Sequence, residues 1–167
     1  MSNPQLPPAL LALDPGIRES GWACFQGGRM QATGCIARPR HLKLTAGERI
    51  DHLTDCLDRL AAEWALGALV CCQPSGIRWK APSLELLESR LALWSQRHRL
   101  ERHTYTAQEV RAAITGSARV SRDQLAYTIT ASLGLIGKRK TTHEWEAVAV
   151  GYYHLYRGID LGKGSCT

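Results

Sequence analysis

The sequence predicts an α/β domain in which an antiparallel three-stranded meander is followed by βαβ crossovers. Three observations support this fold class. The first quarter of the chain holds three strand-like segments separated by turn sequences, an unbroken apolar run follows at 68–72, and helical patterns alternate with the later strands. At 167 residues the chain is long enough for one domain with its own core, with flexible tails expected at 1–8 and 159–167.

Each strand is predicted from its local pattern. Gly27-Gly28 is expected to form the turn of the second hairpin, because two adjacent glycines suit a tight reversal. The run at 68–72 shows no alternation, which is typical of a strand covered on both faces. The predicted strands lie at 9–14, 20–26, 30–37, 68–72 and 100–105.

Helices are predicted where a Ser or Thr precedes a Glu or Gln by three residues, since these pairs form capping boxes. The pattern occurs at Thr45, Thr106, Ser121 and Thr141. A further helix is expected from Ser83 to about His98. Glu144 is the partner of Thr141 in this pattern, so we assign it to the cap of the last helix. The predicted order is βββαβαβααα.

Composition narrows the class of partner. The net charge of +6 and the pI near 9.2 favour an anionic partner, with nucleic acid first, although such charge can also serve only solubility. No apolar run approaches the roughly 20 residues that cross a bilayer, so no membrane is expected. The beginning of the chain lacks the order of a signal peptide, and six cysteines without a CxxC pair resemble reduced thiols. We expect a cytoplasmic protein without zinc.

Asp14 is the first candidate for chemistry, because it lies where a buried strand meets Pro15-Gly16. A carboxylate there can hold a divalent cation, but Asp-Pro-Gly is also a common turn in which the acid only caps a loop. Parallel neighbouring strands end at the same sheet edge, and the period of two gives Asp14 and Cys72 equivalent positions. On the last helix, His143 and Glu146 project within about 60° of each other and can face that edge.

Three motifs stand out in the sequence: DPGIRESGW at 14–22, a segment at 110–122 with arginines on either side of Gly116, and HEWEAVA at 143–149. Together they resemble the RuvC-type Holliday junction resolvases of the RNase H-like superfamily, whose opening motif is DPGxRxxGY and whose closing motif is D/H-x-x-D-A-x-A. The segment at 110–122 is similar to the Val-Lys, Gly and Lys region of that family, with arginine at both basic positions. The order and spacing agree from about 9 to 157. The resemblance implies a single RNase H-like nuclease domain over 1–167, whose five-stranded mixed sheet has three antiparallel strands, then two parallel ones, flanked by helices.

The resemblance also implies a catalytic site made of Asp14, Cys72, His143 and Glu146. Asp14, His143 and Glu146 would bind metal, with two Mg²⁺ (or Mn²⁺) ions per site in an active form. The family has glutamate where this chain has Cys72, and aspartate where it has Glu146. A thiol is mostly neutral at pH 7 and is a poor ligand for hard cations, so we expect two-metal cleavage to be impaired.

Basic and aromatic side chains are expected to contact DNA. Arg111 and Arg122 lie near predicted helix starts, which favour anions, and the loop at 77–80 places two cations around an indole. The cluster at 138–140 would follow the DNA backbone. Alternatively, each of these groups is ordinary surface charge without a role in DNA binding. The predicted set is Arg18, Gln73, Ile77, Arg78, Trp79, Lys80, Arg111, Arg122, Lys138, Arg139 and Lys140.

Three function classes remain open from the sequence. The first is a metal-dependent endonuclease that resolves Holliday junctions in DNA recombination and repair, and the second is a catalytically inactive branched-DNA-binding protein of the same fold. The third is half of a sugar kinase or actin-like ATPase, against which the lack of a second copy of the fold argues. Hydrolysis of RNA/DNA hybrids is also open, because fold alone does not choose a substrate.

A resolvase that nicks two opposed strands of a symmetric junction should be a homodimer. The helix at 83–98 carries Leu86 and Leu93 outside its main apolar stripe, which makes it the candidate dimer element. Alternatively, this helix is simply well buried in the monomer.

Overall fold

The computed structural model describes residues 7–38, 41–73, 81–135 and 137–156. Every predicted strand and helix is present. Its strands are β1 (Ala9–Asp14), β2 (Glu19–Gln26), β3 (Arg29–Ala37), β4 (Leu66–Gln73) and β5 (Glu101–Thr106). Its helices are α1 (Ala46–Glu63), α2 (Pro82–Arg97), α3 (Ala107–Thr115), α4 (Arg122–Leu133) and α5 (Thr142–Tyr156). The expected tails lie outside the described residues except for positions 7 and 8.

The five strands form one mixed sheet in the order β3-β2-β1-β4-β5. β1 pairs antiparallel with β2, and β2 pairs antiparallel with β3. β4 runs parallel to β1, and β5 runs parallel to β4. The predicted arrangement of three antiparallel strands followed by two parallel strands is therefore confirmed.

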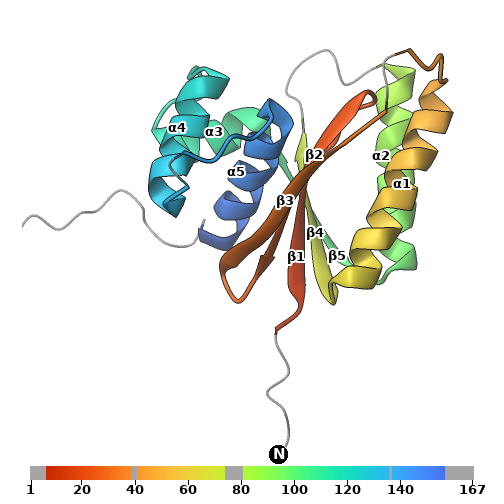
Figure 1. Cartoon of the computed structure of the whole chain (residues 1–167), viewed down its shortest axis with the longest axis horizontal. Coiled ribbons are helices and arrows are strands. Elements are labelled where there is room, and N and C mark those ends of the chain that lie inside the picture. Colours follow the sequence, from red (N-terminus) through yellow and green to blue (C-terminus); the bar gives the residue numbers. More distant parts are fainter. Residues whose placement is uncertain (1–6, 39–40, 74–80, 136, 157–167) are drawn as a thin grey trace, which may run out of the picture.

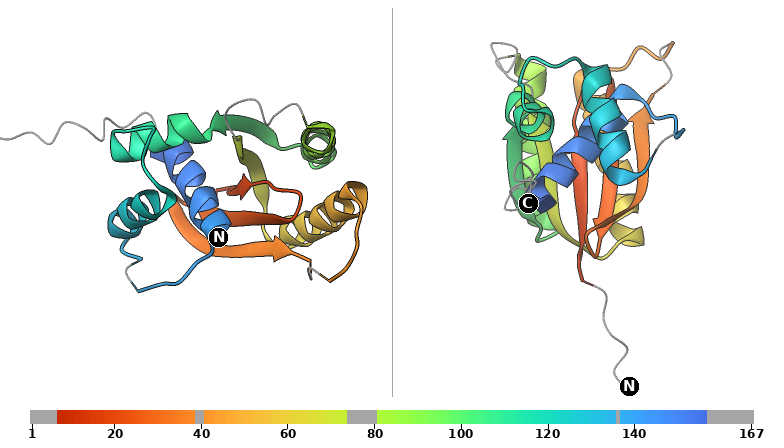
Figure 2. Two further views of the ribbon diagram at one scale, coloured as in Figure 1. Left: turned by 90° about the horizontal axis from the view of Figure 1, so that it is seen from above. Right: turned by 90° about the vertical axis from the view of Figure 1, so that its left-hand side faces the viewer.

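Helices cover both faces of the sheet: α1 and α2 lie on one face, and α3, α4 and α5 lie on the other (Figures 1 and 2). The alternation of each strand divides its side chains between two cores. Leu11 and Cys71 belong to the core under α1 and α2, whereas Ala12 and Cys72 belong to the core under α5. The carboxyl ends of β1 and β4 thus present alternate residues to α5.

Local capping sets most helix boundaries. The capping boxes predicted at Thr45, Thr106 and Ser121 are all formed. At Thr141, the hydroxyl accepts a hydrogen bond from the Glu144 amide and the Glu144 carboxylate accepts one from the Thr141 amide, which confirms the cap assigned to Glu144.

The start of α2 differs from the sequence prediction. The helix begins at Pro82, and its N-cap residue Ala81 makes no capping hydrogen bond through its side chain. Proline suits the first helical turn because its missing N–H would have no partner there and its φ angle is already helical. Ser83 is therefore inside the helix, not at its first position. Within the described part of the chain, no helix combines the length and apolar character needed to span a membrane.

Candidate active site

Three separate segments meet where β1 and β4 end. Leu13 of β1 pairs with Cys71 of β4 in the parallel register. Asp14 and Cys72, the next residues along these two strands, therefore lie at the same edge of the sheet. α5 packs over this face of the sheet and brings His143 and Glu146 to it. The convergence predicted from the sequence is therefore present in the fold.

Gly21 allows α5 to approach β2 closely. A Cβ atom at Gly21 would lie 2.0 Å from the carbonyl carbon and oxygen of His143 and 2.5 Å from the Glu144 amide nitrogen. Only a residue without a side chain fits under the first turn of the helix. This contact sets the distance between His143 and the sheet.

His143 forms a hydrogen bond with Asp14. Its Nδ1 atom lies 2.7 Å from Oδ2 of Asp14. This hydrogen bond, together with the negative charge of Asp14, raises the pKa of His143 above its ordinary value in spite of its partial burial. The imidazole therefore stays protonated to a higher pH than usual.

Glu146 is a buried carboxylate, with 4% of its surface exposed. Its Oε1 atom accepts a hydrogen bond from Nη2 of Arg111 at 2.5 Å, and Nε of Arg122 lies 3.8 Å away. Its Oε2 atom is buried and has no hydrogen-bond partner among the described residues. Arg111, expected as a phosphate clamp, is thus also the counterion of Glu146.

Cys72 lies near the end of β4 with only 2% of its surface exposed. Burial raises the pKa of its thiol well above the ordinary value, and the charges of Asp14 and Glu146 raise it further. The thiol is therefore neutral at physiological pH.

The donor atoms at this site limit what it can hold. In the part of the chain that is described, no three or more His, Cys, Asp or Glu side chains cluster in a way that could hold a metal ion. One oxygen each of Asp14 and Glu146 already has a cationic partner, and Cys72 adds no charge. The unpartnered Oε2 of Glu146 and the carboxylate of Asp14 are oxygen donors of the kind that hard divalent cations prefer.

The predicted DNA-contacting residues fall into three groups. Arg122, Arg18, Lys138 and Arg139 are exposed, while Gln73 is half-buried at the end of β4. The Lys140 ammonium donates to the Thr33 hydroxyl of β3. The predictions at Ile77, Arg78, Trp79 and Lys80 lie outside the described residues.

Sequence reasoning missed two arginines near this edge. Arg38 follows β3 and Arg49 lies in the first turns of α1, and both line a groove of about 700 Å³ whose wall also contains Arg18 and His143. Neither arginine belongs to a motif, and both lie far from Asp14 along the chain. The only available signal was their positive charge, which many surface residues share.

Comparisons with known proteins agree with this geometry. Residues 10–154 match the family model of the crossover junction endodeoxyribonuclease RuvC. The chain is 28% identical over 163 residues to the crossover junction endodeoxyribonuclease RuvC of Frankia casuarinae, an alignment that covers 92% of each chain. It is 25% identical over 167 residues to the protein of the same name from Corynebacterium diphtheriae, covering 88% of this chain and 93% of the relative.

Solved structures show the same fold. The chain superposes on Thermus thermophilus RuvC with a TM-score of 0.74 at 16% identity, covering 90% of this chain and 96% of the other. Against T. thermophilus RuvC in complex with a Holliday junction substrate, the TM-score is 0.76 at 15% identity, covering 91% and 95%. The likeness shows that the chain shares the fold of these structures. Because the family model matches residues 10–154, which make up most of this chain, the chain belongs to the RuvC family of crossover junction endodeoxyribonucleases.

Proposed function

We propose that this protein is a structure-selective endodeoxyribonuclease that resolves Holliday junctions by hydrolysing phosphodiester bonds during DNA recombination and repair. The observation that carries the proposal is the gathering of Asp14, Cys72, His143 and Glu146 at one sheet edge in a member of the RuvC family. The relatives are named crossover junction endodeoxyribonucleases, and one neighbouring structure is described with a Holliday junction substrate. A single nuclease domain carries the site.

Hydrolysis depends on a divalent cation, Mg²⁺ or Mn²⁺, held by the carboxylates of Asp14 and Glu146. When bound, such a cation polarises the scissile phosphate and lowers the pKa of a water molecule. Cys72 leaves the site short of the anionic ligand that a second ion requires. We therefore propose one ion per site in this chain instead of two.

The protein's own side chains position the reacting groups. His143 holds its proton at Nδ1 against Asp14 and so fixes the orientation of that carboxylate. Arg111 holds Glu146, and Arg122 lies beside it with most of its side chain exposed, ready to pair with a DNA phosphate. In the overall reaction a water oxygen bonds to phosphorus, the bond from phosphorus to the leaving oxygen breaks, and that oxygen takes up a proton.

Three further roles complete the proposal. We propose that phosphate or sugar contacts are made by Arg18, Gln73, Lys138 and Arg139. The loop at 77–80 would supply base stacking. The protein acts as a homodimer, since a four-way junction is two-fold symmetric. It works in the cytoplasm, a setting supported by the described cysteines, all of which are free thiols.

A second candidate function is binding of branched DNA without cleavage. One observation favours it: a neutral, buried thiol stands at the position where the family resemblance implies a metal-binding carboxylate. The basic surface would persist in such a protein while the chemistry would not.

Cleavage of a synthetic four-way junction tests both candidates. The chain, Cys72→Glu and Cys72→Glu/Asp14→Asn are compared in Mg²⁺ and in Mn²⁺, with a linear duplex of the same sequence as the control substrate. We expect the chain to nick the junction in preference to the duplex, the glutamate variant to nick it at least about tenfold faster, and the double variant to be inactive. Junction binding without nicking, followed by cleavage only in Cys72→Glu, supports the second candidate. Equal binding of junction and duplex contradicts both.

A further inference from the structure

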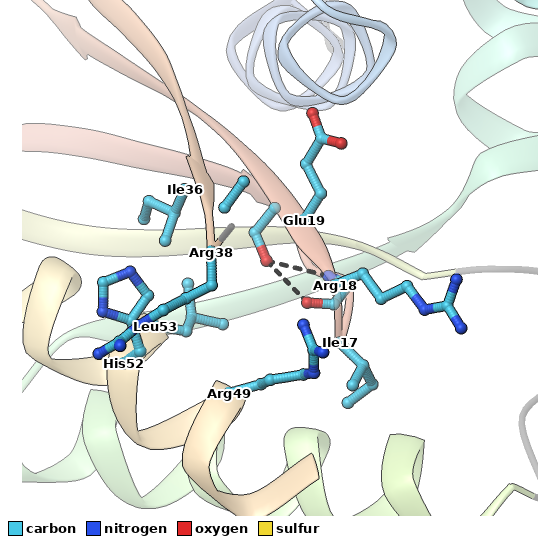
Figure 3. Close-up of a pocket in the computed structure, with 11 residues that line it drawn as sticks. Ile17, Arg18, Glu19, Ile36, Arg38, Arg49, His52 and Leu53 are labelled. Atoms are coloured by element: carbon cyan, nitrogen blue, oxygen red, sulfur yellow. Dashed lines mark hydrogen bonds between the residues drawn. The ribbon is translucent and has the colours of Figure 1, made fainter. Parts of the chain in front are cut away.

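A groove beside the catalytic edge is lined by three arginines from different elements. We call it the arginine groove and define it by Arg18 in the β1–β2 turn, Arg38 after β3 and Arg49 in α1. It has a volume of about 700 Å³, and His143 forms part of its wall. Figure 3 shows an adjoining pocket that shares Arg38 and Arg49 with the groove; there Arg38 lies near His52, and Arg49 reaches toward the turn at Ile17. The groove therefore opens directly beside the candidate active site.

The guanidinium groups of the arginine groove are not neutralised by neighbouring acids. Among the described residues, none of the three forms an ion pair, and Nε of Arg49 donates only to the Leu44 carbonyl at 3.3 Å. A carboxylate does line the groove at Glu19, but its side chain points toward α5 and accepts a hydrogen bond from the Cys35 thiol at 2.9 Å (Figure 3). Glu48, which Arg38 influences electrostatically, is engaged in the capping box with Thr45. The groove keeps a net positive charge.

The lining of the arginine groove favours phosphates over bases. Guanidinium groups match phosphate oxygens in shape and charge, whereas base recognition without pairing relies on aromatic stacking. Among the described residues, those that line the groove include no Trp, Tyr or Phe. Its ligand is thus an anionic backbone whose sequence is not read.

We propose that the arginine groove binds the sugar–phosphate backbone of the DNA strand next to the scissile phosphate, with one phosphate at Arg38 and one at Arg49. The proposal rests on the proposed function, because the groove shares the His143 wall with the site that cuts the strand. Arg18 contacts the strand where it passes from the groove to the catalytic edge. The contact adds affinity without sequence preference.

The salt dependence of junction binding tests this proposal. Affinity of the metal-free full-length protein for a fluorescent four-way junction is measured over a series of salt concentrations. Each phosphate contact adds close to one unit to the slope of log affinity against log salt. We expect Arg38→Gln/Arg49→Gln to lower this slope by about 2 per protomer and to weaken binding equally for junctions of different arm sequence. Arg38→Lys/Arg49→Lys, which keeps both charges, should retain the slope.

The matched control is Arg29→Gln/Arg59→Gln, which removes the same charge from two exposed positions, one at the start of β3 and one in the second half of α1. If this control lowers the slope as much as the groove variant does, only net charge matters and the groove proposal is wrong. If the unchanged chain fails to prefer the junction over a duplex, the proposed function fails, whatever the groove does. Thermal unfolding verifies that each variant is folded. Should the double variant unfold, the exposed single variant Arg38→Gln is measured, with an expected loss of about 1 in slope.

Discussion

The pairing of Arg111 with Glu146 joins two mostly buried charged groups at the site. Glu146 is buried, and its near partner is a guanidinium that is itself mostly covered. Removing one member of such a pair leaves a buried charge uncompensated, whereas removing both restores neutrality. We expect Arg111→Met to lower the free energy of unfolding by about 3 kcal/mol, measured by urea denaturation.

A double-mutant cycle tests that explanation. Arg111→Met/Glu146→Gln should recover more than half of the loss, because no unpaired charge remains. Arg122 lies 3.8 Å from the same oxygen and would compensate in part, so Arg122→Met alone is expected to cost much less. A double variant as unstable as Arg111→Met would show that packing, and not charge, explains the effect.

The hydrogen bond between Asp14 and His143 predicts a titration that can be followed directly. Asp14→Asn removes the charge and acceptor that raise the pKa of His143, and the burial that remains lowers it. We expect the pKa of the His143 ring, measured by NMR, to fall to its ordinary value of 6.5 or below. The pKa of His52, which burial and the charges of Arg38 and Arg59 hold below the ordinary range, should not move.

The sign of the effect on stability follows from the same shift. Because folding raises the pKa of His143, its contribution to stability is fully present below pH 6.5 and is lost as the pH rises through the folded value. Asp14→Asn should therefore destabilise the protein more at pH 5.5 than at pH 9. An equal cost at both pH values would contradict the ionic character of the bond.

At the scale of elements, the close packing of α5 against the sheet is required to form the site. Gly21 lies under the first turn of α5, and a Cβ atom at Gly151 would lie 2.3 Å from Cε2 of Phe25. Gly21→Ala would push the helix away from β2 and carry His143 out of reach of Asp14. We expect a loss of about 3 kcal/mol or more in unfolding free energy and loss of junction cleavage.

Gly47→Ala is the matched control, because the added methyl group would meet only the Thr45 hydroxyl at 3.9 Å. Alanine is also the better helix former, so this variant should be neutral or slightly more stable, within about 1 kcal/mol. Urea denaturation of both variants measures the contrast. Equal stability of Gly21→Ala and Gly47→Ala would contradict the close approach of α5.

Most elements were predictable because their signals are local. A capping box fixes the start of a helix within four residues, and Gly116 and Gly134 end α3 and α4 with the positive φ angles that glycine adopts freely. The start of α2 was misplaced because its signal is a proline at the first position and not a capping side chain.

At the scale of the whole molecule, α2 leaves an apolar strip uncovered. Leu86 and Leu93 are seven residues apart, so they share one side of the helix, and they are 39% and 61% exposed. In the proposed homodimer this strip would be buried. We expect Leu93→Glu to shift the protein toward monomer in sedimentation velocity and to reduce its preference for junction over duplex.

Tyr127→Glu serves as the control, since Tyr127 is 77% exposed on α4, on the other face of the sheet. Neither substitution removes core packing, so both variants should unfold at temperatures close to that of the unchanged chain. A dimer that survives Leu93→Glu but dissociates with Tyr127→Glu would move the interface to α4.

The sequence by itself determined the order of the elements, the mixed sheet and the four positions of the candidate site. These follow from short-range patterns: the period of two along β1 and β4, the three-residue spacing of His143 and Glu146, and the motifs that contain them. Only the tertiary structure decided which groups pair. Arg111 became the partner of Glu146, the thiol of Cys72 became buried, and Arg38 and Arg49 came to line the same groove. The physical reason is that burial and Coulomb interactions depend on distances in space between segments far apart in the chain, which no local pattern encodes.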